Sequence, residues 1–445
     1  MRNYTKQDIV RMVEEEDVEF IRLQFTDIFG NFKNMAVTTS QLEKVLSNQC
    51  VFNGMAIEGF SQMEEPDLYL YPDLSTFEIF PWRPQQGKVA RFICDVYHPD
   101  GTPFGSDSRL VLKKVLAQAK ELGYLFKAGP ECEFVLFDME ENGDVTTDTD
   151  ERGGFFDVGP VDAGENARRE IVMTLEQMGF EVEASYHANA PAQHEIDFKY
   201  DGGLATADNI MTFRMAVRTI ARRHGLHATF MPKPKSGVDG SGMHLNLSLY
   251  DATGKNIFYC EEAEDGLSQA GRYFIAGLLK HIDAITAITN PLVNSYKRLV
   301  PGYGAPVYVA WSASANRTAL VRTGVKNGKI NRIELRCPDP SANPYLALAV
   351  CLAAGLDGIR NQLEPPTKVE GNIYAMTDAQ RKERGIRNLP EHLSAAIDAL
   401  EQDSYMCEVL GEQLVKSYIS AKRAEWKEYC TSVSEWEVRK YLDRF

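Results

Sequence analysis

The sequence predicts an α+β protein in which a small strand-rich unit precedes a larger domain of strands and helices. Short runs of β-branched and aromatic residues dominate the first hundred residues. A segment rich in proline and glycine, residues 99–105, then marks a boundary. Beyond it, strands with one polar face alternate with amphipathic helices. We therefore divide the chain into residues 1–104 and residues 105–445.

Apolar periodicity and turn residues place the elements of the first unit. Helices are expected over residues 4–16 and 40–47, and Thr5 with Asp8 forms an imperfect capping box at the first. Strands are expected over residues 18–25, 33–38, 68–70, 77–82 and 88–97, with the third and fourth separated at Pro72-Asp73.

The second unit begins with a helix over residues 109–122, for which Asp107 or Ser108 is the expected N-cap. An acidic surface loop is expected over residues 138–154. Further helices are expected over residues 165–178, 206–224, 268–289 and 344–363, and an amphipathic helical part over residues 389–445.

Four strands of the second unit gather acids, His or Arg on one face. In residues 129–137, Glu131 and Glu133 point the same way because side chains alternate along a strand. Two such carboxylates repel each other unless a cation lies between them. A solvated sheet face is the alternative for any single strand, whereas four together favour a polar cleft. The other groups are Glu195 with Asp197, His244 with Asn246 and Ser248, and Arg332 with Glu334 and Arg336.

Charge and cysteine content exclude several classes of function. The net charge of -15 argues against a nucleic-acid partner, so an anionic ligand must be held by local Arg and Lys. Residues 1–6 lack the apolar segment of a signal peptide, and the longest apolar run, residues 345–356, is too short to span a membrane. Eight cysteines without a CxxC pair are typical of a reducing compartment, so a cytoplasmic location is expected.

The polar residues indicate a divalent cation and an anion. Oxygen ligands with one imidazole suit Mg²⁺ or Mn²⁺ rather than a structural zinc, and guanidinium groups bind carboxylate and phosphate. Together they indicate phosphoryl transfer from a nucleotide, although Arg317 and Arg322 taken singly are more typical of surface ion pairs. The candidate metal ligands are Glu131, Glu133, Glu195, His244 and Glu334, and the candidate arginines are Arg298, Arg317, Arg322, Arg332 and Arg336.

Ordered motifs along nearly the whole chain carry a resemblance to a known family. They are Ile57-Glu58-Gly59-Phe60, Gly129-Pro130-Glu131-Cys132-Glu133-Phe134, Lys233-Pro234, Gly240-Ser241-Gly242-Met243-His244, Asn294-Ser295-Tyr296-Lys297-Arg298-Leu299-Val300-Pro301-Gly302-Tyr303, Asn316-Arg317 and Asn343-Pro344-Tyr345-Leu346-Ala347. Through these motifs the chain resembles a prokaryotic type I glutamine synthetase, close to the short form of Gram-positive bacteria.

This resemblance implies a fold, an assembly and a reaction. The fold would be an N-terminal β-grasp domain and a catalytic domain whose antiparallel strands form a funnel. Family members assemble as two stacked six-membered rings with active sites between neighbouring subunits, so a homododecamer is expected. ATP would phosphorylate the γ-carboxylate of glutamate, and an amine would attack the acyl phosphate, because a carboxylate needs a good leaving group before it reacts.

The resemblance also implies roles for individual residues. Arg317, Arg322 and Arg336 would neutralise the transferred phosphoryl group. The remaining sets are Glu131, His244 and Glu334 for one metal; Glu133 and Glu195 for a second; Glu183, Phe198, Asn246, Ser248, Arg317, Arg322 and Arg332 for ATP; and Asp239, Gly240, Arg298 and Arg336 for glutamate.

Departures from the family cluster where its members bind ammonium and close a flap. Asp239 stands where the family usually has Asn, so the identity of the acid substrate stays open. Gln62 stands where Gram-positive members have an arginine used in feedback control, so ordinary nitrogen regulation is not expected. The other departures are Asn53 for Asp, Met55 for Ser, Phe155 for Tyr, Ala188 for a Glu of the second metal site, and Gly304 for the flap Glu.

These departures empty the ammonium site of negative charge, which weakens cation binding by roughly 1 kcal/mol or more per close charge. They also open volume and make it more apolar. We therefore expect a ligase that joins glutamate to an organic amine larger than ammonium, similar to γ-glutamyl-amine ligases. Two alternatives stay open: a homologue without ligase activity that serves a structural or regulatory assembly, and an ordinary glutamine synthetase with unusual pocket residues.

Overall fold

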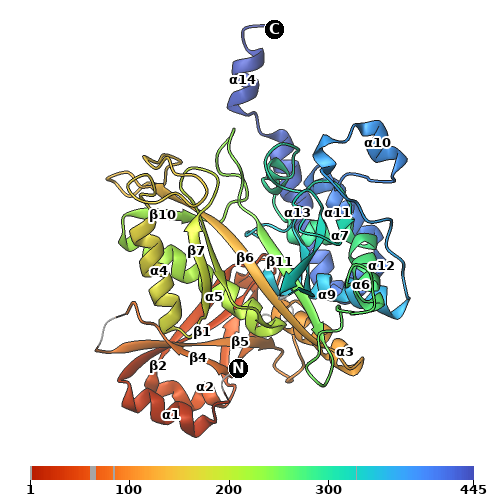
Figure 1. The fold of residues 1–445 in the computed structure, drawn as a ribbon. Helices are drawn as coiled ribbons and strands as arrows, with labels where there is room; N and C mark the ends of the chain where they lie inside the picture. Colours follow the sequence, from red (N-terminus) through yellow and green to blue (C-terminus); the bar gives the residue numbers. More distant parts are fainter. Residues whose placement is uncertain (1–2, 61–66, 84–85, 327) are drawn as a thin grey trace.

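The computed structural model describes residues 3–60, 67–83, 86–326 and 328–445, which form two β-sheets and a helical layer (Figure 1). A five-stranded sheet occupies the N-terminal part, and a nine-stranded sheet with most of the helices occupies the rest. The predicted α+β class is confirmed. The division between residues 104 and 105 stays a prediction.

The N-terminal sheet has the strand order β2-β1-β5-β4-β3, in which β1 and β5 are parallel. Helices α1 and α2 pack against it, and the capping box of Thr5 and Asp8 at α1 is complete. The bounds are α1 Lys6–Glu15, β1 Val18–Thr26, β2 Phe32–Thr38, α2 Leu42–Leu46, β3 Cys50–Asn53, β4 Asp67–Ile79 and β5 Lys88–Tyr97.

The predicted break at Pro72-Asp73 is wrong, because β4 runs through it as one strand. Pro72 lies opposite Cys94 of β5. On the other side of β4, the partner strand β3 reaches only as far as Leu70. A proline there removes no ladder hydrogen bond from β3, so the strand continues. The short strand β3 was not predicted.

The large sheet contains all four polar-faced strands that the sequence predicts, as β6, β8, β11 and β14. Its order is β12-β13-β14-β11-β6-β8-β7, with β9 and β10 also paired to β6. The bounds are β6 Leu125–Asp138, β7 Val182–His187, β8 Gln193–Phe198, β9 Asp201–Gly202, β10 Leu226–Thr229, β11 Met243–Tyr250, β12 Trp311–Ser312, β13 Val321–Lys326 and β14 Lys329–Leu335.

Helix α9 forms the centre of the helical layer, since residues 344–358 are all buried. It packs against α3, α5, α6, α7 and α12. The bounds are α3 Ser108–Glu121, α4 Glu165–Gln177, α5 Gly203–Arg223, α6 Gln269–Lys280, α7 Ile282–Thr289, α8 Ser295–Arg298, α9 Pro344–Arg360, α10 Asp378–Glu383, α11 Leu393–Gln402, α12 Ser404–Leu410, α13 Glu412–Thr431 and α14 Glu435–Tyr441.

The single helix predicted over residues 268–289 is two helices, α6 and α7, that meet at His281. The ring nitrogens of His281 lie 2.6 Å from Asp403 Oδ2 and 3.0 Å from Asp357 Oδ2. These tertiary contacts hold the break, which the continuous apolar pattern of the segment does not reveal.

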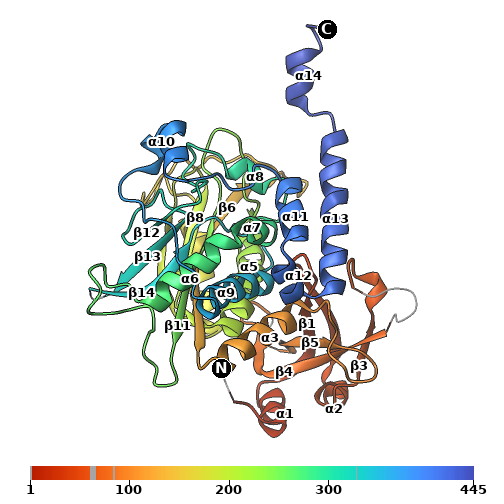
Figure 2. The same cartoon turned by 90° about the vertical axis from the view of Figure 1, so that its right-hand side faces the viewer.

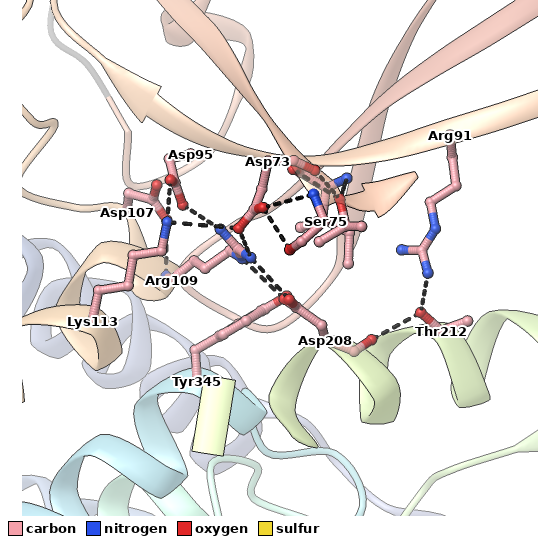
Figure 3. A network of polar contacts seen from close by, with 12 residues as sticks. Asp73, Ser75, Arg91, Asp95, Asp107, Arg109, Lys113, Asp208, Thr212 and Tyr345 are labelled. Carbon is pink, nitrogen blue, oxygen red and sulfur yellow. Dashed lines mark hydrogen bonds and ion pairs between the residues drawn. The ribbon is translucent and has the colours of Figure 1, made fainter. Parts of the chain in front are cut away.

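A buried arginine network joins the N-terminal sheet to the helical layer (Figure 3). The guanidinium of Arg109, at the start of α3, is 2% exposed. It lies 2.8 Å from Asp73 of β4, 2.7 Å from Asp95 of β5 and 2.9 Å from Asp208 of α5. Tyr345 of α9 donates to the same Asp208 at 2.7 Å. Because each partner comes from a different element, this cation fixes the N-terminal sheet on the helical layer.

The C-terminal helix α14 extends beyond α13 and stands clear of the rest of the chain (Figure 2). Its exposed side chains include the large apolar residues Trp436 and Val438. Among the helices that the structure describes, none is long and apolar enough to cross a membrane.

Candidate active site

Three side chains predicted to bind one metal ion lie together at the centre of the large sheet. His244 of β11 is paired with Glu131 of β6, and Glu334 lies on β14, the neighbour of β11 on its other side. One ligand atom from each lies within 4.8 Å of the others. His244 Nδ1 is 3.1 Å from Glu131 Oε2 and 3.7 Å from Glu334 Oε1. Two carboxylates and an imidazole at this spacing suit a divalent cation.

The carboxylate of Glu334 fits a cation closely. Its side chain is 1% exposed, and Oε1 has no hydrogen-bond donor within the described residues. Arg322 Nε donates to Oε2 at 2.6 Å. Arg336 Nε lies 3.2 Å from Oε1, but without hydrogen-bond geometry. A buried anionic oxygen without a donor is unfavourable unless a cation binds it, so these residues fit the metal that the sequence predicts.

Glu131 is held in its ionised form. Burial alone raises the pKa of Glu131, but His244, Asn246 and the charge of Arg322 outweigh it and lower the pKa to about 2. Asn246 Nδ2 donates to Glu131 Oε1 at 3.0 Å, and Asn246 Oδ1 accepts from Arg332 Nε at 2.7 Å. The metal-side carboxylate is therefore ready to bind a cation at neutral pH.

A second acidic group lies beside the first. In the pairing of β6 with β8, Glu133 lies opposite Glu195, and Glu131 lies opposite Asp197. Burial and the neighbouring Glu133 and Asp197 raise the pKa of Glu195 to about 10. Burial and Glu131 raise the pKa of Asp197 to about 7. Acidic side chains that lie opposite one another on paired strands share protons or a cation. The second metal position, on Glu133 and Glu195, stays a prediction.

A cavity of about 330 Å³ lies on one side of Glu131. Phe198, Tyr200 and Tyr250 are among its lining residues, and Lys127 Nζ lies 5.5 Å from the ring centroid of Tyr200 and 4.9 Å from that of Tyr250. Of the seven residues predicted to contact ATP, five line this cavity, namely Glu183, Phe198, Asn246, Ser248 and Arg332. The other two, Arg317 and Arg322, line the neighbouring cavity instead.

The neighbouring cavity has a volume of about 490 Å³. Glu131 lines both cavities, so the candidate metal position lies where they meet. Arg298 is 3% exposed, and its Nη1 donates to the carbonyl oxygen of Cys337 at 2.7 Å. All four residues predicted to hold glutamate line this cavity, namely Asp239, Gly240, Arg298 and Arg336.

The amine side of this cavity differs from the expectation. Phe155 and Gly304 line it as predicted. Gly304 has φ +72°, and a Cβ atom built there would lie 3.4 Å from Asp239 Oδ2. Asn189 Nδ2 donates to the same oxygen at 2.6 Å. The expectation of a corner without negative charge is therefore wrong, because the carboxylate of Asp239 lies beside the position of the missing flap Glu.

Three residues assigned to the amine pocket do not line this cavity. Asn53 ends β3 of the N-terminal sheet, and Met55 lies in the 3-10 helix Gly54–Ala56 that follows it. Asn53 Oδ1 accepts from the backbone N–H of Met55 at 2.9 Å. Ala188 is fully buried. The expectation that its short side chain opens volume in the cavity is therefore wrong, since neighbouring atoms fill the space. Gln62 lies outside the described residues.

Several lining residues were not assigned a role from the sequence. The ring of Phe156 lies 5.7 Å from that of Phe155 and 5.0 Å from that of Tyr186, measured between centroids. Tyr186 Oη donates to Asp197 Oδ2 at 3.4 Å. Two adjacent phenylalanines in a glycine-rich loop were the signal that a binding surface lies there.

Buried polar groups anchor the loop that carries Phe155. His187 Nε2 lies 2.6 Å from Glu151 Oε1. Burial lowers the pKa of His187, but its bonds to Glu151 and to the carbonyl oxygen of Ala188 outweigh this and raise it. Asp162 pairs with Arg168 at 2.6 Å, and Arg168 Nη1 lies 2.7 Å from His194 Nδ1. His194 Nε2 has no hydrogen-bond partner among the described residues, and one ligand atom each of Glu151, Asp162 and His194 lies within 4.8 Å of the others. Because ion pairs and hydrogen bonds link the other groups, we interpret the cluster mainly as support for the loop.

Comparison with known proteins assigns both parts of the chain to one family. Residues 17–99 match the family described as "Glutamine synthetase, beta-Grasp domain", and residues 105–441 match "Glutamine synthetase, catalytic domain". A glutamine synthetase from Clostridium saccharobutylicum is 58% identical over 445 residues, which cover 100% of both chains. One from Staphylococcus aureus (strain Mu50 / ATCC 700699) is 52% identical over 445 residues, covering 100% of this chain and 99% of that protein.

Two solved structures resemble the chain over its length. The structure named "GmaS/ADP complex-Conformation 1" has a TM-score of 0.89 at 33% identity and covers 98% of this chain and 99% of its own. "Apo GmaS without ligand" has a TM-score of 0.86 at 33% identity and covers 98% of this chain and 100% of its own. These findings confirm the predicted β-grasp and catalytic domains and the predicted enzyme class. The chain therefore belongs to the glutamine synthetase family, whose members are ATP-dependent ligases that join a carboxylate to ammonia or an amine.

Proposed function

We propose that the protein uses ATP and a divalent cation, Mg²⁺ or Mn²⁺, to join the γ-carboxylate of glutamate to an organic amine larger than ammonium. One contrast supports the proposal: Glu131, His244 and Glu334 lie together as predicted for a metal, whereas the residues around Asp239 differ from those usual in the family. Gly304 leaves space beside Asp239, and Phe155 brings an apolar ring to the same cavity.

The phosphate side has the groups that such a reaction requires. A divalent cation held by Glu131, His244 and Glu334 would offset the charge of the nucleotide phosphates. Arg317 and Arg336 line the adjoining cavity and would stabilise the transferred phosphoryl group. The buried Arg298 offers a fixed guanidinium for the carboxylate of the amino-acid substrate.

On the amine side, the proposal assigns roles to the carboxylate of Asp239 and the rings of Phe155 and Phe156, which line the cavity together with Glu133 and Glu195. An amine arrives mostly protonated and must lose a proton before it attacks the acyl phosphate. Asp239 would bind the ammonium group and receive this proton, beside the space that Gly304 leaves. Phe155 and Phe156 would cover the substituent that ammonium lacks.

A neighbouring subunit would complete the cavity with Asn53 and Met55. Both are exposed on their own chain and line neither active-site cavity. The exposed apolar residues Trp436, Leu442 and Phe445 at the end of the chain also favour burial in an oligomer. These observations support the proposed dodecamer of two six-membered rings.

Glutamine synthesis from ammonium is a second candidate function. Two observations favour it: the identity of 58% with a glutamine synthetase over the full length, and the carboxylate of Asp239 close to the flap position. This carboxylate would attract ammonium as well as a larger amine.

Phosphate release from ATP with glutamate and Mg²⁺ tests these alternatives. The nucleophile is ammonium, a series from methylamine to butylamine, or a diamine, and mass spectrometry identifies each amide product. We expect a higher kcat/KM for at least one organic amine than for ammonium. Preference for ammonium would favour glutamine synthesis, and no release with any nucleophile would favour a non-catalytic assembly.

A further inference from the structure

A buried lysine, from a motif that has no role in the proposed reaction, lies behind the amine side of the active site. Lys233, of the Lys233-Pro234 motif, lies between β10 and β11 and is 9% exposed. It lines neither active-site cavity. Asn294 fixes its backbone, since Asn294 Oδ1 accepts from the N–H of Lys233 at 2.7 Å and Asn294 Nδ2 donates to its carbonyl oxygen at 3.0 Å. A charged group this deeply buried needs partners, so its contacts indicate its role.

The ammonium group of Lys233 contacts two segments that lie far apart in the sequence. Its Nζ donates to the carbonyl oxygen of Val238. The same Nζ lies 3.7 Å from the centroid of the Tyr303 ring, which is the shortest cation–ring distance among the described residues. Cation–π contacts become stronger when solvent is excluded from them. One cation therefore joins the segment that contains Val238 to the segment that contains Tyr303.

These two contacts adjoin the residues that meet on the amine side. Val238 precedes Asp239 in the segment 238–241, which we call the Asp239 loop, and Tyr303 precedes Gly304 in the segment 303–305, which we call the Gly304 turn. A Cβ atom built on Gly304 would lie 3.4 Å from Asp239 Oδ2, so the loop and the turn touch there. Lys233 therefore links the two segments one residue before the point at which they meet.

Local hydrogen bonds shape each segment but do not join one to the other. The N–H of Ser241 donates to the carbonyl oxygen of Pro232 at 2.8 Å, and the N–H of Ala305 donates to the carbonyl oxygen of Tyr303 at 2.8 Å. Within the part of the chain that the structure describes, no hydrogen bond runs between the Asp239 loop and the Gly304 turn. The side chain of Lys233 supplies the polar link that these segments otherwise lack.

We propose that Lys233 is a positioning residue for the amine side, which keeps the Asp239 loop against the Gly304 turn so that the nucleophile is held and water is excluded. This inference rests on the proposed ligase reaction, but not on which nucleophile is used. Where the segments separate, water attacks the carbonyl carbon of γ-glutamyl phosphate. The bond from that carbon to the phosphate oxygen breaks, glutamate and phosphate are released, and a proton passes to solvent. ATP is then consumed without formation of an amide.

The ratio of phosphate released to amide formed tests this role, in the full chain with ATP, glutamate, Mg²⁺ and the preferred nucleophile. Lys233→Met keeps the length of the side chain and removes its charge. We expect the ratio to rise about twofold and the KM for the nucleophile about tenfold, with the KM for ATP unchanged. Lys233→Arg keeps a cation and should restore most of the coupling. Tyr303→Leu should raise the ratio in the same way and add little when combined with Lys233→Met.

Lys422→Met is the matched control. Lys422 is 4% exposed and its Nζ lies 5.3 Å from the ring centroid of Phe29, but it lines neither active-site cavity. Its substitution should lower Tm without raising the ratio of phosphate to amide. A similar rise in Lys422→Met, an unchanged ratio in folded Lys233→Met, or an equal rise in the KM for ATP would overturn the proposal.

Hydrogen exchange tests the link separately from turnover. The N–H groups of Ser241 and Ala305 are hydrogen-bonded, so their exchange reports the opening of each segment. In Lys233→Met, peptides covering residues 238–241 and 303–305 should exchange about tenfold faster, with the rest of the catalytic domain unchanged. Unchanged exchange in both segments, or faster exchange throughout the domain, would overturn the positioning role. Absence of turnover by the unmodified protein would instead overturn the proposed function, and the exchange result would still decide the link.

Discussion

The two halves of the active-site cleft are built in different ways. On the metal and phosphate side, charged groups pair with one another, as Glu334 does with Arg322 and Arg336. On the amine side, Gly304, Phe155 and Phe156 line the same cavity as Asp239, and the side-chain amide of Asn189 donates a hydrogen bond to that carboxylate. Removing one member of a paired set leaves the others unsatisfied, whereas the amine side can change one residue at a time. We therefore expect the chemical step and the choice of nucleophile to respond to different substitutions.

The largest effect is expected on the paired side. Glu334→Gln removes one negative charge that faces both the metal position and two arginines. Phosphate release should fall by roughly 100-fold or more with ammonium and with every organic amine. Steady-state kinetics with each nucleophile measures this, and Glu141→Gln on the exposed loop is the control. A loss confined to one nucleophile would show that the two halves are not separable.

A smaller effect is expected on the amine side, where substitutions should change the preference between ammonium and an organic amine rather than the overall rate. The double variant Asp239→Asn with Gly304→Glu returns both positions to the residues usual in the family. Moving the carboxylate to the flap should shift the ratio of kcat/KM for ammonium over an organic amine about tenfold toward ammonium, which corresponds to about 1.4 kcal/mol.

The single variants of this pair serve as internal controls. Asp239→Asn alone should lower the kcat/KM for every amine, because the cavity loses the carboxylate beside Gly304. Gly304→Glu alone brings a second carboxylate close to Asp239 at φ +72°, where a side chain is strained. An unchanged ratio in the double variant would contradict the role given to Asp239.

A few-fold effect is expected from the aromatic residue at the rim. Phe155→Tyr restores the phenol usual in the family on a side chain that is 46% exposed. Because solvent weakens the new polar contact, preference for ammonium should rise by only about two- to fivefold. Val158→Thr, in the same loop and outside the cavity lining, is the control. A larger change in preference would show that Phe155 affects the choice of nucleophile more than Asp239 and Gly304 do.

The smallest effect concerns the support of the aromatic loop. The pKa of His187 is raised in the folded protein by Glu151 and a backbone carbonyl, despite burial. Its stabilisation is complete below pH 6.5 and is lost as pH rises through the raised pKa. The free energy of unfolding of the unmodified protein minus that of His187→Gln should therefore decrease by about 1 kcal/mol between pH 6 and pH 9.

Chemical denaturation across this pH range measures the difference. A difference that stays constant or grows with pH would contradict the pairing of His187 with Glu151.

The alternation of polar residues predicted the site strands well, because period-two alternation fixes which side chains share a face. Glu131 and Glu133 share a face as predicted, and strand pairing adds His244 opposite Glu131. The strand β13, which brings Arg322 opposite Glu334, was missed. Sequence also did not show that Asp239 lies beside Gly304, since these residues meet only through tertiary packing.

The buried charge network around Arg109 limits which chimeras of this protein could fold. This cation receives Asp73 and Asp95 from the N-terminal sheet and Asp208 from the helical layer. A chimera that joins the N-terminal sheet or the helical layer to a foreign partner would leave Arg109 or its aspartates buried without a partner of opposite charge. Recombination between relatives should therefore succeed where the acceptor supplies matching acids, and shuffling of the two halves as independent modules should fail.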